Sequence, residues 1–174
     1  MFSGFLTYTL VAMTAFSSGS STKPVDNKHF LIHGDVIEID PIQMKEIDAT
    51  DTRIIVYQED EIYVAFNTDD QGKYKFNLPV GHMYRVVYGG DKYVNKEVFI
   101  DAHDIPMKRY GYNVVLDMGV VKEYEGVDFS FLAAPVALIA FDSAYGKMVF
   151  DESHSKKKGK EMLKCLKKIT KLHG

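Results

Sequence analysis

A short acidic segment, TDDQGKYKFNLPVG at residues 68–81, has the oxygen-bearing side chains and the glycine that a calcium-binding loop requires. In a 12-residue loop counted from Asn67, oxygen ligands fall at positions 1, 3 and 5, which are Asn67, Asp69 and Gln71, and Gly72 falls at position 6. Position 12, where such loops carry a bidentate glutamate, is Leu78. The tight turn of a β-hairpin explains the same residues, because short acidic side chains favour turns and glycine readily adopts positive φ. We expect the turn without a bound metal, and a calcium site is the alternative.

A second group of possible metal ligands lies in the segment IDAHDIP, where Asp101, His103 and Asp104 fall within four residues. Oxygen and nitrogen ligands at this spacing could hold a metal ion. Pro106 follows closely, however, and the group lies where a strand should end. An exposed loop is therefore the expected structure.

Motifs for nucleophilic, metal-dependent or nucleotide chemistry are absent from the sequence, which has no G-x-S-x-G, H-E-x-x-H, Walker or G-x-G-x-x-G pattern. Asp151, His154 and Ser155 are close in sequence, but a triad is defined by its spatial arrangement. We expect a protein without a cofactor and without catalytic activity. The alternative is a hydrolase whose site is assembled from His33, His82 or His103 beside a carboxylate.

The C-terminal residues 151–174 concentrate positive charge, with 8 Lys against 3 acidic residues, whereas the whole chain has a net charge of −3. Apolar residues at helical spacing predict an amphipathic helix that packs through one stripe: Met162, Cys165, Leu166, Ile169 and Leu172. Its start has two candidate caps, Ser153 and Ser155. The lysines predict a surface that binds an anionic partner, with these candidates: Lys156, Lys157, Lys158, Lys160, Lys164, Lys167 and Lys168.

Two interpretations of these lysines are compatible with each other. One is an anion-binding surface, and the other is the solvated face of a helix that is docked on the rest of the protein. Aromatic side chains that would stack on bases are absent from the segment, so we expect no nucleic-acid binding.

The elements before this helix read as strands. Apolar side chains alternate with polar ones in short runs, separated by turn residues about every 10–12 positions. The runs cover residues 30–39, 53–58, 62–67, 73–78, 83–89, 93–100 and 112–118, and a further hairpin with a turn at Ser143–Gly146 follows. They predict a mainly β protein: a seven-stranded Greek-key sandwich over residues 29–118, an extension with a hairpin over 119–150, and the lysine-rich helix over 151–174.

The first 28 residues differ from the rest. The apolar segment Phe5–Phe16 is too short to cross a bilayer, which takes about 20 residues. An apolar segment followed by small residues suits a secretory signal, although the usual basic start is missing. We expect a signal-like segment and linker over residues 1–28, and no transmembrane span in the chain.

Several segments together resemble the carboxypeptidase regulatory-like domain, a prealbumin-like (transthyretin-like) sandwich. The resemblance rests on HGDVIEID, RIIVYQ, NTDDQGKYKFNLPVG, YRVVYGG and YVNKEV, within Phe30–Ile100. The combination of the Thr-Asp…Gly turn with the Leu78-Pro79-Val80-Gly81 corner is its most specific part. The segment DPIQMKEIDATDT departs from the family pattern, because it is longer and more acidic than the usual Gly-x-Pro segment.

The later part, including EGVDFSFL before Pro135, is similar to uncharacterised cell-envelope proteins of Bacteroidota. This resemblance implies an exported, periplasmic or envelope-associated binding or scaffolding module, with an envelope protein or an anionic surface as its partner. Hydrolases of the transthyretin-related group end in Tyr-Arg-Gly-Ser, and this chain ends in KITKLHG. Their activity is therefore not expected.

Overall fold

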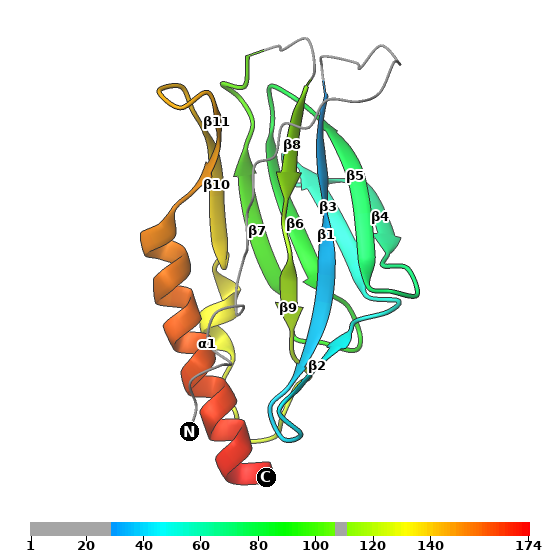
Figure 1. Ribbon diagram of the computed structural model, residues 1–174, viewed down its shortest axis with the longest axis vertical. Coiled ribbons are helices and arrows are strands. Elements are labelled where there is room, and N and C mark those ends of the chain that lie inside the picture. The colour runs from blue at the N-terminus through cyan, green and yellow to red at the C-terminus, as the bar shows by residue number, and fades with distance from the viewer. Residues whose placement is uncertain (1–28, 107–110) are drawn as a thin grey trace.

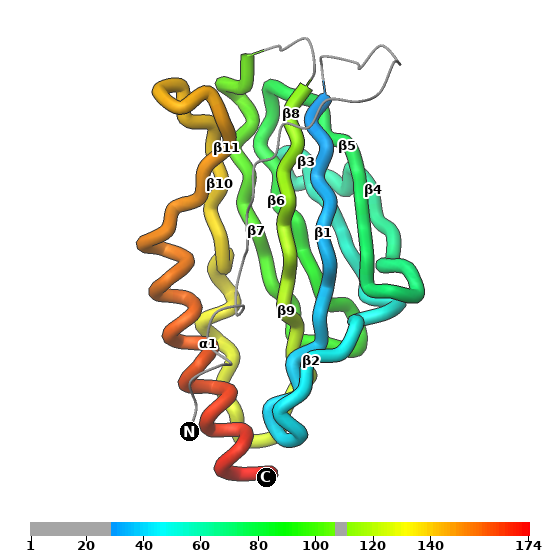
Figure 2. The backbone as a smooth tube through the Cα atoms, viewed as in Figure 1, coloured from blue at the N-terminus to red at the C-terminus, as the bar shows by residue number. Residues whose placement is uncertain are grey.

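The computed structural model describes residues 29–106 and 111–174. These residues form 11 strands in two sheets that face each other, with one long helix along the side of the sandwich (Figures 1 and 2). The prediction of a mainly β sandwich with a C-terminal helix is confirmed. The predicted signal-like segment lies outside the described residues.

The first sheet is built around one long strand, β1 (His29–Asp40). Along one side β1 pairs antiparallel with β5 (Lys73–Pro79) and then with β2 (Lys45–Asp48). Along its other side it pairs parallel with β8 (Tyr112–Val115) and then with β9 (Met118–Val120). The alternation in β5 has the predicted phase, because Tyr74, Phe76 and Leu78 are buried while Lys73, Lys75 and Asn77 are exposed.

The second sheet has the strand order β11-β10-β7-β6-β3-β4. Its strands are β3 (Arg53–Gln58), β4 (Glu61–Asn67), β6 (Met83–Gly89), β7 (Lys96–Asp101), β10 (Ala137–Asp142) and β11 (Lys147–Phe150). The predicted hairpin is thus β10–β11, and its first strand joins this sheet by parallel pairing with β7. Its turn has Gly146 at φ 61, a conformation that glycine adopts readily.

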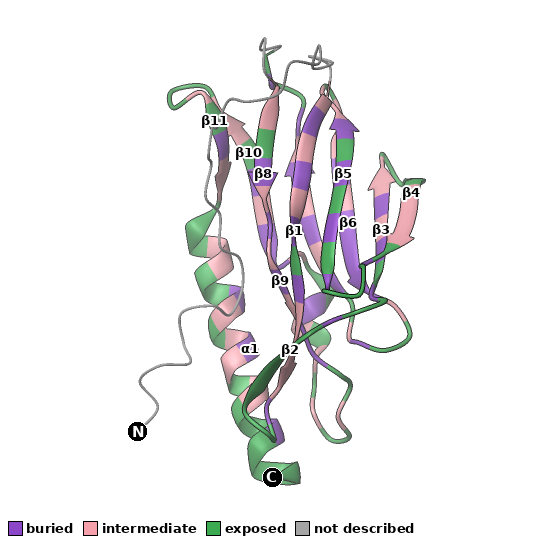
Figure 3. Cartoon of the chain, turned by 45° about the vertical axis from the view of Figure 1, so that its right-hand side comes forward, coloured by how far each residue is buried: buried purple, intermediate pink, exposed green. Residues whose placement is uncertain are grey.

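The core between the two sheets combines aliphatic and aromatic side chains. Tyr84 and Phe30 meet edge to face with ring centroids 6.2 Å apart. The hydroxyls of Tyr74 and Tyr88 lie 2.8 Å apart, and the Tyr74 hydroxyl also donates to the carbonyl of Leu116. Buried residues alternate with exposed ones along the strands, as Figure 3 shows. The phenol groups thereby enter the interior with their hydrogen bonds made.

The acidic turn in TDDQGKYKFNLPVG does not connect the two strands of a hairpin, so the hairpin predicted there is wrong. β4 pairs with β3 in the second sheet and β5 pairs with β1 in the first, so this turn carries the chain from one sheet to the other. The Asp69 carboxylate accepts hydrogen bonds from the amides of Gln71 at 2.9 Å and Lys73 at 2.8 Å, and Gly72 has φ 73. Alternating strands around a turn do not specify which sheet each strand joins, because that choice depends on distant partners.

The strand predicted over residues 112–118 is interrupted in the structure. The amide of Asp35 in β1 donates to the Asp117 carboxylate at 2.9 Å, and the carbonyl of Leu116 meets the Tyr74 hydroxyl in the core. Gly34 lies against this site, and a Cβ atom there would collide with the Leu116 carbonyl. A side chain therefore takes the place of a backbone acceptor where β8 ends and β9 begins.

Two further elements differ from the predictions. β2 lies within the acidic segment between the first two predicted strands, where no strand was expected. A short 3-10 helix, η1 (Ser130–Ala133), lies in the connection from β9 to β10.

α1 (Glu152–His173) follows β11 and lies beside β10 and η1 in Figure 1. In the described part of the chain, no helix combines the length and the apolar character needed to span a membrane.

Candidate functional site

The helix α1 is closed at both ends by hydrogen bonds. Asp151 is the N-cap, and its carboxylate accepts the amide of His154 at 2.9 Å, so neither Ser153 nor Ser155 is the cap that the sequence suggested. At the other end the amide of Gly174 donates to Thr170 at 3.1 Å. Lys171 and His173 lie in the last turn, where a cation complements the helix dipole. The helix is therefore well defined by its own sequence as well as by its contacts.

One face of α1 is docked on the sandwich. Met162 and Ile169 are buried, whereas Leu172, which the sequence placed in the same stripe, is 53% exposed. The backbone of the β9–β10 connection receives polar contacts from the helix. His154 Nε2 lies 2.6 Å from the carbonyl of Pro135, and His173 Nε2 lies 3.0 Å from that of Glu125. These contacts fix the rotation of the helix about its axis.

Lys158 belongs to the docked face, which corrects its place among the predicted anion-binding lysines. It is 8% exposed, and its ammonium group donates to the carbonyl of Phe131. Lys158 precedes Met162 by four residues and Ile169 by eleven, so helical periodicity places all three on one face. That spacing is the signal in the sequence that could have separated Lys158 from the other lysines.

The opposite face of α1 consists of lysines. At about 100° per residue, seven lysines fall within an arc of roughly 120° centred opposite the buried stripe. All seven are exposed: Lys156, Lys157, Lys160, Lys164, Lys167, Lys168 and Lys171. We call them the lysine face. Lys171 was not among the predicted binding residues, yet helical geometry places it in the same row.

The lysine face is almost free of carboxylates. The acidic residues of the helix, Glu152 and Glu161, lie at the two borders of the arc. Lys156 forms an ion pair with Glu152 at 2.8 Å, and it is the one lysine of this face with an ion pair among residues 29–106 and 111–174. The remaining six ammonium groups form no ion pair in these ranges, although Lys168 lies near the Asp128 carboxylate of the β9–β10 connection.

The histidines that could form a hydrolytic site are placed apart from the cavities. His82 Nδ1 lies 3.2 Å from a Glu59 carboxylate oxygen, and His103 Nδ1 lies 2.9 Å from Asp101. The His103 amide, followed by the His103 ring, lowers the pKa of Asp101 by hydrogen bonding to its carboxylate. His33 is half-buried in β1, beside Lys75 of β5 and Val115 of β8. None of these three histidines lines either of the two cavities described below.

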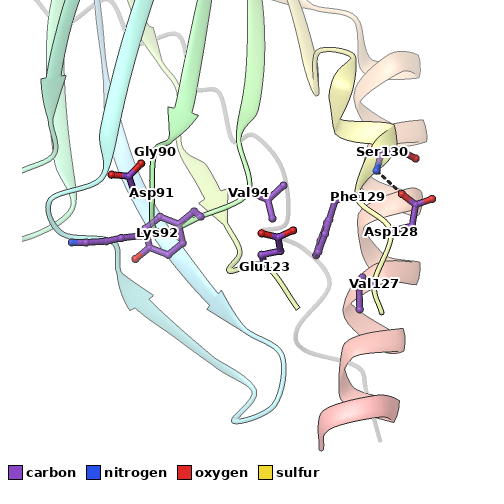
Figure 4. A pocket seen from close by; sticks show the side chains of 10 residues that line it. Gly90, Asp91, Lys92, Val94, Glu123, Val127, Asp128, Phe129 and Ser130 are labelled. Carbon is purple, nitrogen blue, oxygen red and sulfur yellow. Dashed lines mark hydrogen bonds between the residues drawn. The ribbon is translucent and has the colours of Figure 1, made fainter. Parts of the chain in front are cut away.

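The larger cavity, of about 440 Å³, lies between the β6–β7 connection and the segment before η1. Figure 4 shows the Glu123 carboxylate between Val94 and Phe129, whereas Asp128 turns toward the amide of Ser130. The smaller cavity, of about 180 Å³, lies on the outer face of the second sheet. There Arg85 pairs with Glu97 at 3.1 Å and covers the ring of Tyr57 at 4.1 Å, so its polar groups already have partners.

In neither of the two candidate metal-ligand groups of the sequence do the side chains gather around a common point. Asp69 is occupied by the amides of its own turn, and Asp101 by His103. No group of three or more His, Cys, Asp or Glu side chains in the described ranges is arranged to hold a metal ion. The alternative of a calcium loop therefore gains no support from the geometry.

A different lysine, Lys96 of β7, lies in the interior of the sandwich and was not singled out by the sequence. It is fully buried, and its ammonium group donates to the carbonyl of Gly119. Burial lowers its pKa from 10.5 to about 8. The alternation of β7 identifies its position, because Lys96 shares a face with Val98 and Ile100.

Comparison with known proteins gives only distant likenesses. No protein-family model matches the chain, and no curated protein matches it. Among solved structures, 3-chlorocatechol 1,2-dioxygenase from Rhodococcus opacus 1CP aligns with 55% of this chain and 60% of its own, at 9% identity and a TM-score of 0.38. The TIE protein of Bacillus anthracis aligns with 54% of this chain and 17% of its own, at 20% identity and a TM-score of 0.37.

The shaft pilin SpaA of Lactobacillus rhamnosus GG aligns with 56% of this chain and 51% of its own, at 10% identity and a TM-score of 0.36. The chain thus spans less than two thirds of each of these three proteins. Likenesses of this extent give no information about ligand or activity, which must be argued from the chain's own residues.

Proposed function

We propose that this protein is a non-catalytic binding or scaffolding module of the cell envelope that attaches to an anionic surface through the lysine face of α1. The observation that carries the proposal is a row of seven exposed lysines opposite the docked stripe, with an ion pair at Lys156 alone in the described ranges. Such a row attracts anionic groups, because clustered charges of one sign produce a field that extends from the surface.

The position of the row supports binding rather than mere solubility. The apolar stripe holds the helix against the β9–β10 connection, so the lysines are presented on a fixed support. A helix of 22 residues is about 33 Å long, and its lysines can meet an extended surface all at once. Near an anionic membrane, each lysine contributes roughly 1 kcal/mol, and the contribution declines within the Debye length.

The envelope location and the relation to carboxypeptidase regulatory-like domains are parts of the same proposal. Both rest on the sequence resemblance and on the apolar segment within residues 1–28. Support for a non-catalytic role comes from the histidines, which lie outside the two cavities. Hydrolysis by the purified protein that is lost on replacing His82 or His103 would contradict that role.

The test is a matched pair of double variants with the same change in charge. Lys160→Gln with Lys164→Gln removes two charges from the lysine face, and Lys73→Gln with Lys75→Gln removes two exposed charges from β5. We expect the helix variant to bind heparin and phosphatidylglycerol vesicles about 30-fold more weakly, at roughly fivefold per lysine, and the strand variant to change little. Equal losses for the two variants would show that net charge alone acts, and would overturn the proposal.

A further inference from the structure

A group of apolar side chains is exposed at the end of the molecule where α1 finishes. Ile42 is 39% exposed, Met44 45%, Ile47 47% and Leu172 53%. The first three belong to the β1–β2 hairpin and the fourth to the last turn of α1. Figure 1 shows that hairpin and that turn at the same end of the sandwich, opposite the β10–β11 turn. We call these four residues the apolar tip.

The hairpin part of the tip is held in a defined conformation. The Asp40 carboxylate accepts the amides of Ile42 and Gln43, both at 2.9 Å. Met44 has φ 54, a left-handed conformation that is uncommon for a residue with a side chain. The Thr170 hydroxyl of α1 donates to the carbonyl of Pro41 at 2.9 Å, so the hairpin is fastened to the helix. The tip and the lysine face therefore belong to one connected surface region.

The charges around the tip do not separate it from an anionic partner. Glu38 has a countercharge, because it pairs with Lys122 at 2.6 Å, and it also accepts the Tyr93 hydroxyl at 2.9 Å; the Asp40 carboxylate is turned toward the backbone amides of the hairpin turn. In β2, strand alternation places Ile47 on the same face as Lys45 and places the two acids of the strand on the other. Lys167, Lys168 and Lys171 lie in the last two turns of the helix.

An exposed apolar group of this kind gives no advantage in binding a soluble polyanion, which interacts with the lysines alone. A bilayer offers both anionic head groups and an apolar layer beneath them, so aliphatic side chains gain free energy by leaving water there. The apolar stripe of α1 is already used for docking and cannot supply this contribution. Within the described surface, the apolar tip is the exposed apolar group beside the lysine face that can supply this contribution.

We propose that the anionic surface is a lipid bilayer, and that the apolar tip inserts into its interfacial layer while the lysine face contacts anionic head groups. This inference rests on the proposed function, since insertion by four side chains needs the attraction of the lysines to hold it. The apolar tip would provide insertion and the lysine face would provide attraction to the head groups. Variants of each group can test these two contributions separately.

The absence of tryptophan from the chain makes a direct test possible. Met44→Trp places a single tryptophan in the tip, and Tyr145→Trp places one in the β10–β11 turn, where Tyr145 is 74% exposed. With vesicles of phosphatidylglycerol and phosphatidylcholine, we expect a blue shift of the Met44→Trp emission and its quenching by lipids brominated on the acyl chain. The Tyr145→Trp emission should stay unchanged, and heparin should shift neither.

Vesicle flotation gives a second measurement. Ile42→Gln, Met44→Gln and Leu172→Gln combined should weaken binding to these vesicles at least tenfold and leave heparin binding unchanged. Ile62→Gln with Tyr145→Gln is the matched control, because both residues are exposed apolar side chains away from the tip and should have no effect.

The outcomes distinguish the two proposals. If the lysine variants lose binding to heparin and vesicles alike while the tip variant keeps both and Met44→Trp shows no shift, the surface is contacted by charge alone and insertion is wrong. If the lysine variants lose neither, the proposed function itself is wrong. An emission shift of Met44→Trp that persists with uncharged phosphatidylcholine vesicles would also overturn the combined model.

Discussion

Lys96 in the sandwich and the lysine face on α1 show one side chain in two opposite surroundings. The Lys96 ammonium group is fully buried and meets a backbone carbonyl, whereas the seven lysines of the lysine face are exposed, and Lys156 alone among them has an ion pair within the described residues. Between these extremes lies Lys158, which is buried at the helix–sandwich junction although its neighbour Lys157 is exposed. The count of lysines in a segment therefore does not give the charge that a partner can contact.

The largest expected effect concerns the pH dependence of stability through Lys96. Its pKa is about 8 in the folded protein and 10.5 as the ordinary value, so the unfolded chain binds more protons between these pH values. The protein should therefore gain stability as pH rises through this window. The destabilisation caused by the buried ammonium group is at its full size below pH 8. We expect a gain of roughly 2 kcal/mol from pH 7 to pH 9.5 in excess of that seen in Lys96→Met.

Urea unfolding of both proteins at the two pH values measures this difference. Other groups titrate in the same range, but they are shared by the two proteins and cancel. If the native protein and Lys96→Met show the same pH dependence, the Lys96 ammonium group is either exposed to water or paired with a countercharge.

The next effect tests the contrast between Lys158 and Lys157. Lys158→Met keeps an apolar stem but leaves the Phe131 carbonyl without its donor, which should cost about 1–3 kcal/mol in the free energy of unfolding. Lys157→Met should change that free energy by less than about 0.5 kcal/mol, because the side chain is solvated. Equal costs in urea unfolding would mean that the two residues share the same surroundings.

The smallest effect separates stability from binding on the lysine face. Lys164→Glu places a carboxylate four residues from both Lys160 and Lys168, and each such pair stabilises a helix by about 0.2–0.5 kcal/mol. We expect a slight rise in thermal stability together with weaker binding to phosphatidylglycerol vesicles. A fall in stability would indicate that Lys164 has a structural role that the fold does not show.

Much of the fold is predictable because alternation is a local property. Tyr74, Phe76 and Leu78 are buried as their spacing predicts, and Gly72 has the positive φ expected of its turn. The sheet that β5 joins was not predictable in this way, because β4 pairs with its sequence neighbour β3 whereas β5 pairs with β1 from a distant part of the sequence. The local pattern therefore predicts the strands, but it does not predict that the acidic turn between β4 and β5 connects two different sheets.

The exposed placement of the lysines on α1 was predictable in outline, and that of Lys158 was not. Helical spacing identified the lysine-rich face, and the same spacing applied to Lys158 would have placed it with Met162. The apolar tip was not predictable, because it joins the β1–β2 hairpin to a turn of α1 more than 100 residues later, as the Thr170–Pro41 hydrogen bond shows at a separation of 129 residues. Exposure of Ile42 and Met44 depends on that packing and not on the local sequence.

The position of β1 at the centre of the first sheet has a consequence for how the chain folds. Its partners β8 and β9 lie about eighty positions away, as in the pair Asp35 and Asp117 with a separation of 82. During synthesis β1 must wait for most of the chain before one of its sides is covered, and pairings of such long range slow folding. A nascent chain stalled before Tyr112 would thus present an unpaired edge of β1. A chaperone that shields β1 should therefore raise the folding yield more than one that shields α1.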